Sequence, residues 1–460
     1  MKPRFFFFGI LLMLALACSL PARGKPKPAT PAAPPLTATA TTVSAIVPSP
    51  TFTPFAVETI PCSELGGLWT GGAAALRPDG SGYDVSGCER PLPMRQAEMV
   101  KPAERDATRW GAARCNDGSP FGFSLQLSPS GQSREWLIYL EGGAFCEDNA
   151  LSCAARGEKL SSTPNADDRS SVAIEQTGIF NRAASQNPTF YDANFVIAHY
   201  CSSDGWSGAT AEKRPTQADP GGWYFSGRLN VRAMIEILIQ RYGLDDADPR
   251  TRVLFAGSSA GGIGVEVNAD TLATLLPRAA AEGRLRLLDD GGFIPNFDDP
   301  LYRPGDADVS LRDLVVDAYD FWGSSLNPLC EAQMRARGER PGQCFLSARV
   351  YPFIAQPSPA GLGLPLLIQY SSIDRFAIEL HGIDDLNDPA DAAALERWRA
   401  EVLAELQNIP WVFSGGARPY HTILQSDEKM QMGPNGKTFV DALALFWSGG
   451  APMQVIFGNP

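Results

Sequence analysis

One segment in the middle of the chain constrains the fold more than any other, because it joins a buried strand to a helix through a sharp turn. The apolar run at residues 252–256 leads into Gly-Ser-Ser-Ala-Gly at residues 257–261, and a helical pattern follows. This order is typical of a nucleophile elbow, whose glycines leave room for a strained turn that presents the central side chain. We therefore predict that Ser259 is held out at the C-terminal edge of a sheet, beside the backbone amide of Ala260. Ser258 lies off the centre of the turn and is the weaker candidate.

Strand and helix patterns alternate along the rest of the chain. Helical patterns lie at residues 231–242, 389–407 and 438–447. Alternation of this kind favours a mostly parallel sheet with helices on both faces, so we predict one large α/β domain at residues 61–460. The strands are expected at residues 136–140, 195–200, 252–256, 285–288 and 364–370.

A serine at its ordinary pKa is a poor nucleophile and needs a base, and the chain has three histidines. In folds with this turn the chain order is serine, acid, histidine. His421, in the last part of the chain, is therefore the favoured base, and His381 is the alternative. His199 precedes the serine and directly continues an apolar strand, so we expect it to have a structural role.

The acid is expected after a late strand. Asp374 follows the predicted strand at residues 364–370. There its carboxylate would hold the histidine in one tautomer and stabilise the imidazolium. An aspartate at such a position is also a common helix cap. Asp289 and Asp290, which follow the strand at residues 285–288, are competing candidates one strand earlier.

A glycine pair follows an early strand, where its loop could supply backbone amides to an oxyanion site. Glu-Gly-Gly-Ala at residues 141–144 comes directly after the strand at residues 136–140. Loops of this kind donate backbone amides to an oxyanion in esterases, since glycine lets the backbone approach the substrate. We predict that the amides of Gly143 and Ala144 act together with that of Ala260.

The N-terminus has the pattern of an export signal. Lys2 and Arg4 precede an apolar run at residues 5–17. This pattern predicts a signal peptide at residues 1–17, and the run is shorter than the ~20 residues that span a membrane. Cys18 follows at once, which suggests a bacterial lipoprotein with lipid on the Cys18 thiol. Simple secretion is the alternative.

A low-complexity stretch separates the signal from the domain. Residues 25–55 contain 8 Pro, 7 Thr and 6 Ala and no acidic residue. Such a stretch cannot bury enough apolar surface to offset its chain entropy, and Pro-rich chain is semi-extended. We predict that residues 18–60 form a tether, anchored to a membrane if Cys18 carries lipid.

The cysteine count agrees with export. An even number in an exported chain predicts up to four disulfides, whose pairing the spacing does not determine. The chain has no Cys-x-x-Cys and few histidines, so we expect neither a metal nor another cofactor. Apart from Cys18, the cysteines are Cys62, Cys88, Cys115, Cys146, Cys153, Cys201, Cys330 and Cys344.

Several motifs resemble the pectin acetylesterase/Notum carboxylesterase family. They include Tyr-Cys-Ser-Ser-Asp at residues 200–204 and Gly-Ser-Ser-Ala-Gly-Gly at residues 257–262, and the similarity extends from about residue 115 to about residue 424. The resemblance implies an α/β-hydrolase fold and a Ser–His–Asp esterase that releases short or fatty acyl groups from sugar or protein hydroxyls. It places the triad on Ser259, Asp374 and His421.

The resemblance also implies disulfides and shows where the chain departs from its family. It suggests the bridges Cys146–Cys153 and Cys115–Cys201. The family usually has a bulky aromatic residue where this chain has Ala144, and a serine or alanine where it has Gly291. Ala144 should leave more room over the oxyanion site.

The expected function is hydrolysis of an O-acetylated polysaccharide or a similar small ester outside the cell. The net charge of −12 argues against nucleic acid as a partner, since its binding needs dense Lys and Arg. Pectin, a polyanion, would need a local basic patch such as Arg335, Arg337 and Arg340. A solvated loop within a Cys330–Cys344 bridge is the interpretation that we favour for these arginines. The alternatives are a fatty-acyl hydrolase of lipidated protein or lipid, which needs a deep apolar pocket, and an inert surface glycan-binding protein.

Overall fold

The main sheet follows the alternating pattern of the sequence. The computed structural model describes residues 97–146, 174–217, 219–297, 310–381, 387–414, 420–433 and 436–455, single positions between these ranges, and three short strands nearer the N-terminus. The strands of the main sheet are β4 (Glu98–Val100), β5 (Phe123–Gln126), β6 (Glu135–Leu140), β7 (Asn194–Ala198), β10 (Arg252–Ser258), β11 (Leu285–Asp290), β12 (Leu366–Gln369), β13 (Val412–Phe413) and β14 (Gln454–Val455).

The order of these strands decides where the functional side chains meet. It is β14-β13-β12-β11-β10-β6-β7-β5-β4, a nine-stranded sheet within the described residues. Neighbours are parallel from β14 to β7, whereas β5 and β4 pair antiparallel at one edge. Parallel strands end at the same edge, so the residues that directly follow β6, β10, β11 and β12 gather there.

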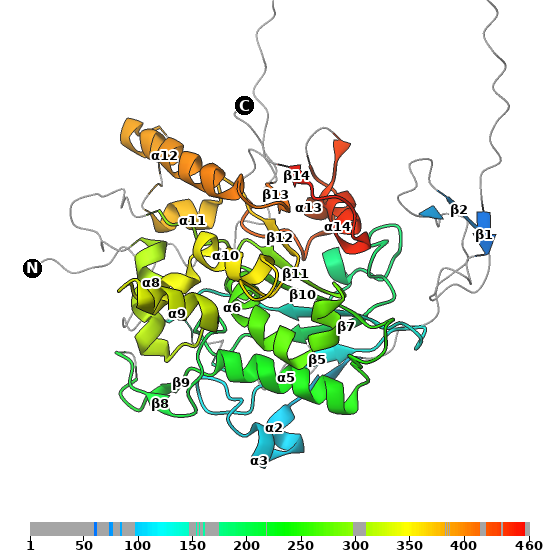
Figure 1. Cartoon of the computed structure of the whole chain (residues 1–460), viewed down its shortest axis with the longest axis horizontal. Helices are drawn as coiled ribbons and strands as arrows, with labels where there is room; N and C mark the ends of the chain where they lie inside the picture. Colours follow the sequence, from blue (N-terminus) through cyan, green and yellow to red (C-terminus); the bar gives the residue numbers. More distant parts are fainter. Residues whose placement is uncertain are drawn as a thin grey trace, which may run out of the picture. The chain divides into compact units, whose positions relative to one another are not determined.

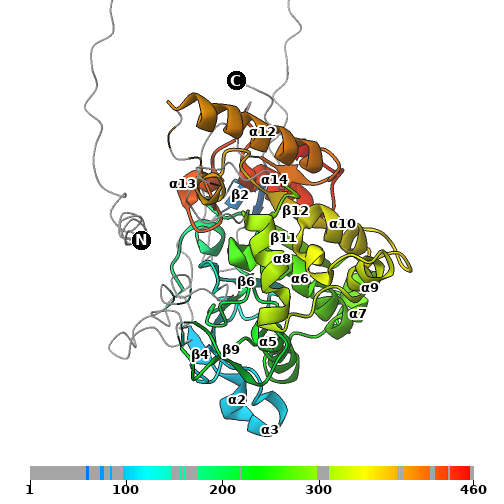
Figure 2. The same cartoon turned by 90° about the vertical axis from the view of Figure 1, so that its left-hand side faces the viewer.

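Helices cover both faces of this sheet. Alternate residues of β6 and β10 enter two separate cores: Ile138 and Phe255 pack with α5 and α6, and Leu137 and Leu254 pack with α14. Figures 1 and 2 show α5 and α6 beside the central strands. The helices are α2 (Pro102–Arg105), α3 (Ala107–Trp110), η3 (Gly178–Phe180), α5 (Gly227–Arg241), α6 (Ala260–Leu275), α7 (Pro277–Ala281), α8 (Leu311–Trp322), α9 (Pro328–Ala336), η4 (Pro341–Phe345), α10 (Ser347–Ala355), α11 (Arg375–Leu380), α12 (Pro389–Leu406), α13 (Asp427–Met430) and α14 (Phe439–Ser448).

The predicted α/β fold is confirmed, and so are the five predicted strands and the three predicted helices. The strands β4, β5, β13 and β14 were not predicted. They have two to four residues each, which is too short for a periodic pattern to stand out.

Helix α5 begins earlier than its apolar pattern indicates. The prediction starts at residue 231, but the helix starts at Gly227. The preceding Ser226 makes no capping hydrogen bond with its side chain. Instead the Gly227 amide donates to the buried carboxylate of Asp204, at 2.8 Å, so a residue far away in the sequence caps the helix.

Several predictions concern residues outside the described ranges. They are the signal peptide, Cys18, nearly all of the tether, Cys62 and Cys88. Nearer the N-terminus the structure describes β1 (Thr59–Pro61), β2 (Ala73–Leu76) and β3 (Tyr83–Asp84), which form an antiparallel sheet of their own. A short hairpin, β8 (Lys213–Arg214) with β9 (Trp223–Tyr224), is also antiparallel. No helix among the described residues is both long and apolar enough to span a membrane.

Three disulfides are present in the described part of the chain. Cys115 pairs with Cys201 and Cys146 with Cys153, which are the two bridges that the resemblance implied. Cys330 pairs with Cys344 and closes the segment that carries Arg335, Arg337 and Arg340. Disulfides of this number are consistent with export to an oxidising compartment.

Two buried carboxyl groups meet behind the C-terminal edge of the sheet. Glu266 of α6 and Asp289 of β11 are 2% and 0% exposed. Burial raises the pKa of Glu266 to about 8. Burial, together with the charge of Glu266, holds the pKa of Asp289 well above its usual range. The pair therefore retains a proton at neutral pH.

This pair should make stability fall as pH rises. An acid whose pKa is higher in the folded than in the unfolded chain stabilises the fold at low pH, and this contribution is lost as pH rises through the folded value. We expect the free energy of unfolding, measured by denaturant titration, to decrease between about pH 5 and about pH 8. Glu266→Gln should make this decrease smaller, because a neutral amide needs no proton.

The matched control is Glu401→Gln, which removes an exposed carboxylate from α12. It should leave the pH dependence as in the parent. An equally steep decrease in the Glu266→Gln variant would contradict the assignment of the retained proton to this pair.

Candidate active site

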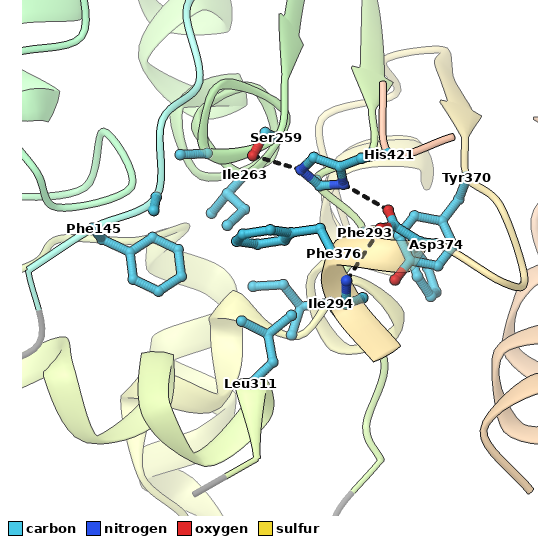
Figure 3. Close-up of a pocket in the computed structure, with 15 residues that line it drawn as sticks. Phe145, Ser259, Ile263, Phe293, Ile294, Leu311, Tyr370, Asp374, Phe376 and His421 are labelled. Carbon is cyan, nitrogen blue, oxygen red and sulfur yellow. Dashed lines mark hydrogen bonds and ion pairs between the residues drawn. The ribbon is translucent and has the colours of Figure 1, made fainter. Parts of the chain in front are cut away.

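Ser259 occupies the turn between β10 and α6 with strained backbone angles. Its φ is 58° and its ψ is −126°, which residues other than glycine rarely adopt. The turn is closed so tightly that a Cβ atom at Gly257 would lie 2.2 Å from the carbonyl oxygen of Gly261. This is the geometry predicted from the Gly-Ser-Ser-Ala-Gly segment, and it directs the Ser259 side chain into a pocket at the sheet edge (Figure 3).

His421 and Asp374 converge on this serine from distant parts of the chain. The Nε2 atom of His421 lies 2.8 Å from the Oγ atom of Ser259. Its Nδ1 atom lies 2.6 Å from the Oδ2 atom of Asp374 (Figure 3). The His421 side chain is 27% exposed, whereas that of Asp374 is fully buried. A buried carboxylate on one ring nitrogen and a hydroxyl on the other is the arrangement of a serine–histidine–aspartate triad.

Asp374 makes both of the contacts that its sequence position suggested. Besides binding His421 through Oδ2, it accepts a hydrogen bond through Oδ1 from the backbone amide of Ala377, at 3.1 Å. It is therefore the N-cap of α11. The cap fixes the carboxylate between the helix and the imidazole.

The competing acid candidates lie elsewhere in the structure. Asp289 pairs with Glu266, as described above. Asp290 accepts hydrogen bonds from the Ser258 hydroxyl and from the backbone amides of Ile423 and Leu424. It thereby ties the turn to the segment that directly follows His421. Burial raises the pKa of Asp290 to about 6. This supporting role was missed, because only the folded chain brings these amides to the end of β11.

The other two histidines have surroundings unlike that of His421. His199 lies between the Ser124 hydroxyl, at 2.9 Å, and the Glu141 carboxylate, at 3.2 Å. His381 is buried against the rings of Phe297 and Trp398, and burial lowers its pKa to about 4. Neither ring nitrogen of His381 has a hydrogen-bond partner in the described structure.

The glycine loop after β6 packs against the turn. A Cβ atom at Gly142 would lie 2.8 Å from the Cβ atom of Ser259. Gly143 and Ala144 both have positive φ angles, 138° and 56°. Within the described ranges, the backbone amides of Gly143, Ala144 and Ala260 donate to no protein acceptor. Three free amides beside a serine are suited to hold a negatively charged oxygen.

The pocket beside Ser259 is small and mostly apolar. Its volume is about 20 Å³, on the order of the space that one water molecule needs. Apart from the triad residues, it is lined by Ala144, Phe145, Ala260, Ile263, Gly291, Gly292, Phe293, Ile294, Leu311, Tyr370, Phe376 and Ala377.

The arginines of the Cys330–Cys344 segment are candidate binding groups for a polyanion, and acidic side chains are candidate ligands of a metal ion. Arg335 binds Glu331 at 3.0 Å, and Arg340 binds Asp317 and the carbonyl of Val316, so two of the three arginines in the bridged segment have protein partners. In the ranges that the structure covers, no group of three or more His, Cys, Asp or Glu side chains is placed to hold a metal ion.

Comparison with curated proteins finds esterases. Palmitoleoyl-protein carboxylesterase NOTUM from Mus musculus is 34% identical over 248 residues, which are 53% of this chain and 46% of the mouse protein. Palmitoleoyl-protein carboxylesterase notum2 from Xenopus laevis is 29% identical over 361 residues, which are 75% of this chain and 68% of that protein. The chain spans about half the length of several curated relatives that it matches.

Comparison with solved structures and family models agrees with this result. A structure of the Wnt deacylase Notum from Drosophila matches with a TM-score of 0.64 and 25% identity, over 77% of this chain and 94% of that chain. It supports the α/β-hydrolase assignment of the fold. A model of the pectinacetylesterase family matches residues 96–360. Since this match covers more than half of its residues, the chain belongs to the pectinacetylesterase family.

Proposed function

We propose that this protein is a serine esterase that removes short acyl groups, acetyl above all, from hydroxyl groups of an extracellular glycan. The observation that carries the proposal is the Ser259–His421–Asp374 chain of hydrogen bonds at 2.8 Å and 2.6 Å. Membership of an esterase family agrees with it. The family match ends before Asp374 and His421, so the proposal for these two residues rests on the hydrogen-bond geometry and on their order along the chain.

The reaction proceeds through an acyl-enzyme. Ser259 Oγ attacks the ester carbonyl while His421 Nε2 takes its proton, and the buried Asp374 carboxylate stabilises the imidazolium. The amides of Gly143, Ala144 and Ala260 bind the oxyanion, and one such donor is worth roughly 2.7–4 kcal/mol. His421 then protonates the leaving alcohol, and water, activated by the same imidazole, releases the acid.

Pocket size favours a short acyl group. A volume of about 20 Å³ admits a group of methyl size but not a long chain. Relatives of this chain are named for removal of palmitoleoyl groups from protein, and fatty-acyl hydrolysis is the second candidate. It would require a pocket far deeper than the one observed. An inert glycan-binding protein is the third candidate.

Export and anchoring complete the proposal. The signal peptide at residues 1–17 would deliver the domain to the outside of the cell, where the three disulfides are stable. Lipid on Cys18 and the tether would then hold the domain near a membrane. An acylated glycan or a similar small ester would be the substrate.

Substitutions in the triad should abolish hydrolysis without unfolding the protein. We expect Ser259→Ala and His421→Ala each to lower kcat for 4-nitrophenyl acetate by at least about 10⁴-fold, because nucleophile and base act as one unit. Circular dichroism would verify that each variant is folded. Unchanged turnover in Ser259→Ala would refute the assignment of the nucleophile.

The matched control for the base is His381→Phe. The phenyl ring keeps the contacts with Phe297 and Trp398, so activity should remain close to that of the parent. Loss of activity in this variant, with retention in His421→Ala, would reverse the assignment of the base.

The preference for short acyl groups can be measured directly. Among the 4-nitrophenyl esters of acetate, butyrate and octanoate, kcat/KM should be highest for acetate. We expect a decrease of at least about tenfold at octanoate, because extra methylenes in a filled pocket cost about 1–3 kcal/mol. A rise in kcat/KM with chain length would favour the fatty-acyl candidate instead.

A further inference from the structure

We propose that the aromatic ring of Phe376 closes the acyl pocket and sets the longest acyl group that the enzyme accepts. This inference rests on the proposed esterase function and assigns a specificity-determining residue to it. Phe376 is the second residue of α11, and its ring lines the pocket together with Ser259 and His421. Figure 3 shows the ring below the Ser259–His421 pair, between the reacting groups and further apolar side chains.

The ring of Phe376 is held in place by its contact with His421 and by the two hydrogen bonds of Asp374. Its centroid lies 4.8 Å from that of the His421 imidazole, with the two planes inclined by 32°. Asp374, two residues earlier, binds His421 through one oxygen and caps α11 through the other. The backbone that carries Phe376 is thus tied to the triad, and the ring has little freedom to move away.

Apolar side chains that an acyl chain could contact line the rest of the pocket. Phe145, Ile263, Phe293, Ile294 and Leu311 line the same pocket, and each is at most 8% exposed. In Figure 3 the side chains of Ile294 and Leu311 lie on the side of Phe376 away from Ser259. A hydrocarbon chain attached to a carbonyl at Ser259 would reach Ile294 and Leu311 only through the space that the ring occupies, whereas Ile263 lies on the Ser259 side of the ring.

Truncation of the Phe376 ring should therefore enlarge the pocket, and not only reduce activity. The Phe376 side chain is only partly buried, so its removal should enlarge the pocket by about the volume of a benzene-sized guest rather than leave a sealed cavity. A chain of several methylenes is of comparable size. Phe376→Ala should then accept longer acyl groups, and Phe376→Leu should have an intermediate effect.

The test compares 4-nitrophenyl octanoate with 4-nitrophenyl acetate. The ratio of their kcat/KM values is the proper measure, because a general loss of activity through the contact with His421 cancels in it. We expect the ratio to rise at least about tenfold in Phe376→Ala and by less in Phe376→Leu. The control Phe353→Ala truncates a partly buried phenylalanine of α10 that does not line the pocket, and it should leave the ratio unchanged.

A binding measurement separates failure of this inference from failure of the proposed function. Calorimetric titration with octanoate needs no turnover. Ser259→Ala should bind octanoate weakly, and Ser259→Ala with Phe376→Ala should bind it at least about tenfold more tightly. Equal binding by both variants would overturn the role of Phe376, whatever the esterase assays show. If the double variant binds octanoate more tightly but the parent chain hydrolyses no ester, the role of Phe376 in the pocket would stand and the esterase function would be rejected.

Discussion

The close approach of three backbone segments around Ser259 is the constraint on which the site depends. A Cβ atom on Gly261 would lie 2.0 Å from the carbonyl oxygen of Leu140, at the end of β6. A Cβ atom at Gly142 would be nearly as crowded, against the carbonyl oxygen of Ser258 and the Cβ atom of Ser259. The end of β6, the turn and the start of α6 can therefore meet only at glycines. The strained backbone of Ser259 costs roughly 1–3 kcal/mol, and the buried strands on either side must offset it.

A second set of interactions holds the segment after His421 against this turn. Asp290 is fully buried, and its carboxylate joins the Ser258 hydroxyl to the amides of Ile423 and Leu424. Ser258 and the segment after His421 thus share one acceptor. A carboxylate is suited to this task, because it can accept several hydrogen bonds at once, whereas a hydroxyl or an amide accepts fewer.

The parts of the site that could be predicted are those with a local signal. The Gly-Ser-Ser-Ala-Gly segment indicates a strained turn by itself, and the chain order of serine, acid and histidine then favoured Asp374 and His421 over the alternatives His381, Asp289 and Asp290. The cap of α5 by Asp204 and the bonds of Asp290 depend on residues brought together by folding, and no local pattern reveals them. The same holds for the pocket. Ala144 was expected to leave more room, but Phe376, on a different element, fills the space beside His421.

Helix α11 links the chemistry of the site to its selectivity. Its N-cap is Asp374, the proposed acid, and its second residue is Phe376, which lines the pocket. A shift of this helix would move Asp374 away from His421 and at the same time move Phe376. Selectivity can therefore change with little effect on the triad by substitution at residue 376, whereas movement of the backbone would disturb both. A single short helix, capped by the proposed catalytic carboxylate, would in this way position both the hydrogen-bond partner of His421 and the boundary of the acyl pocket.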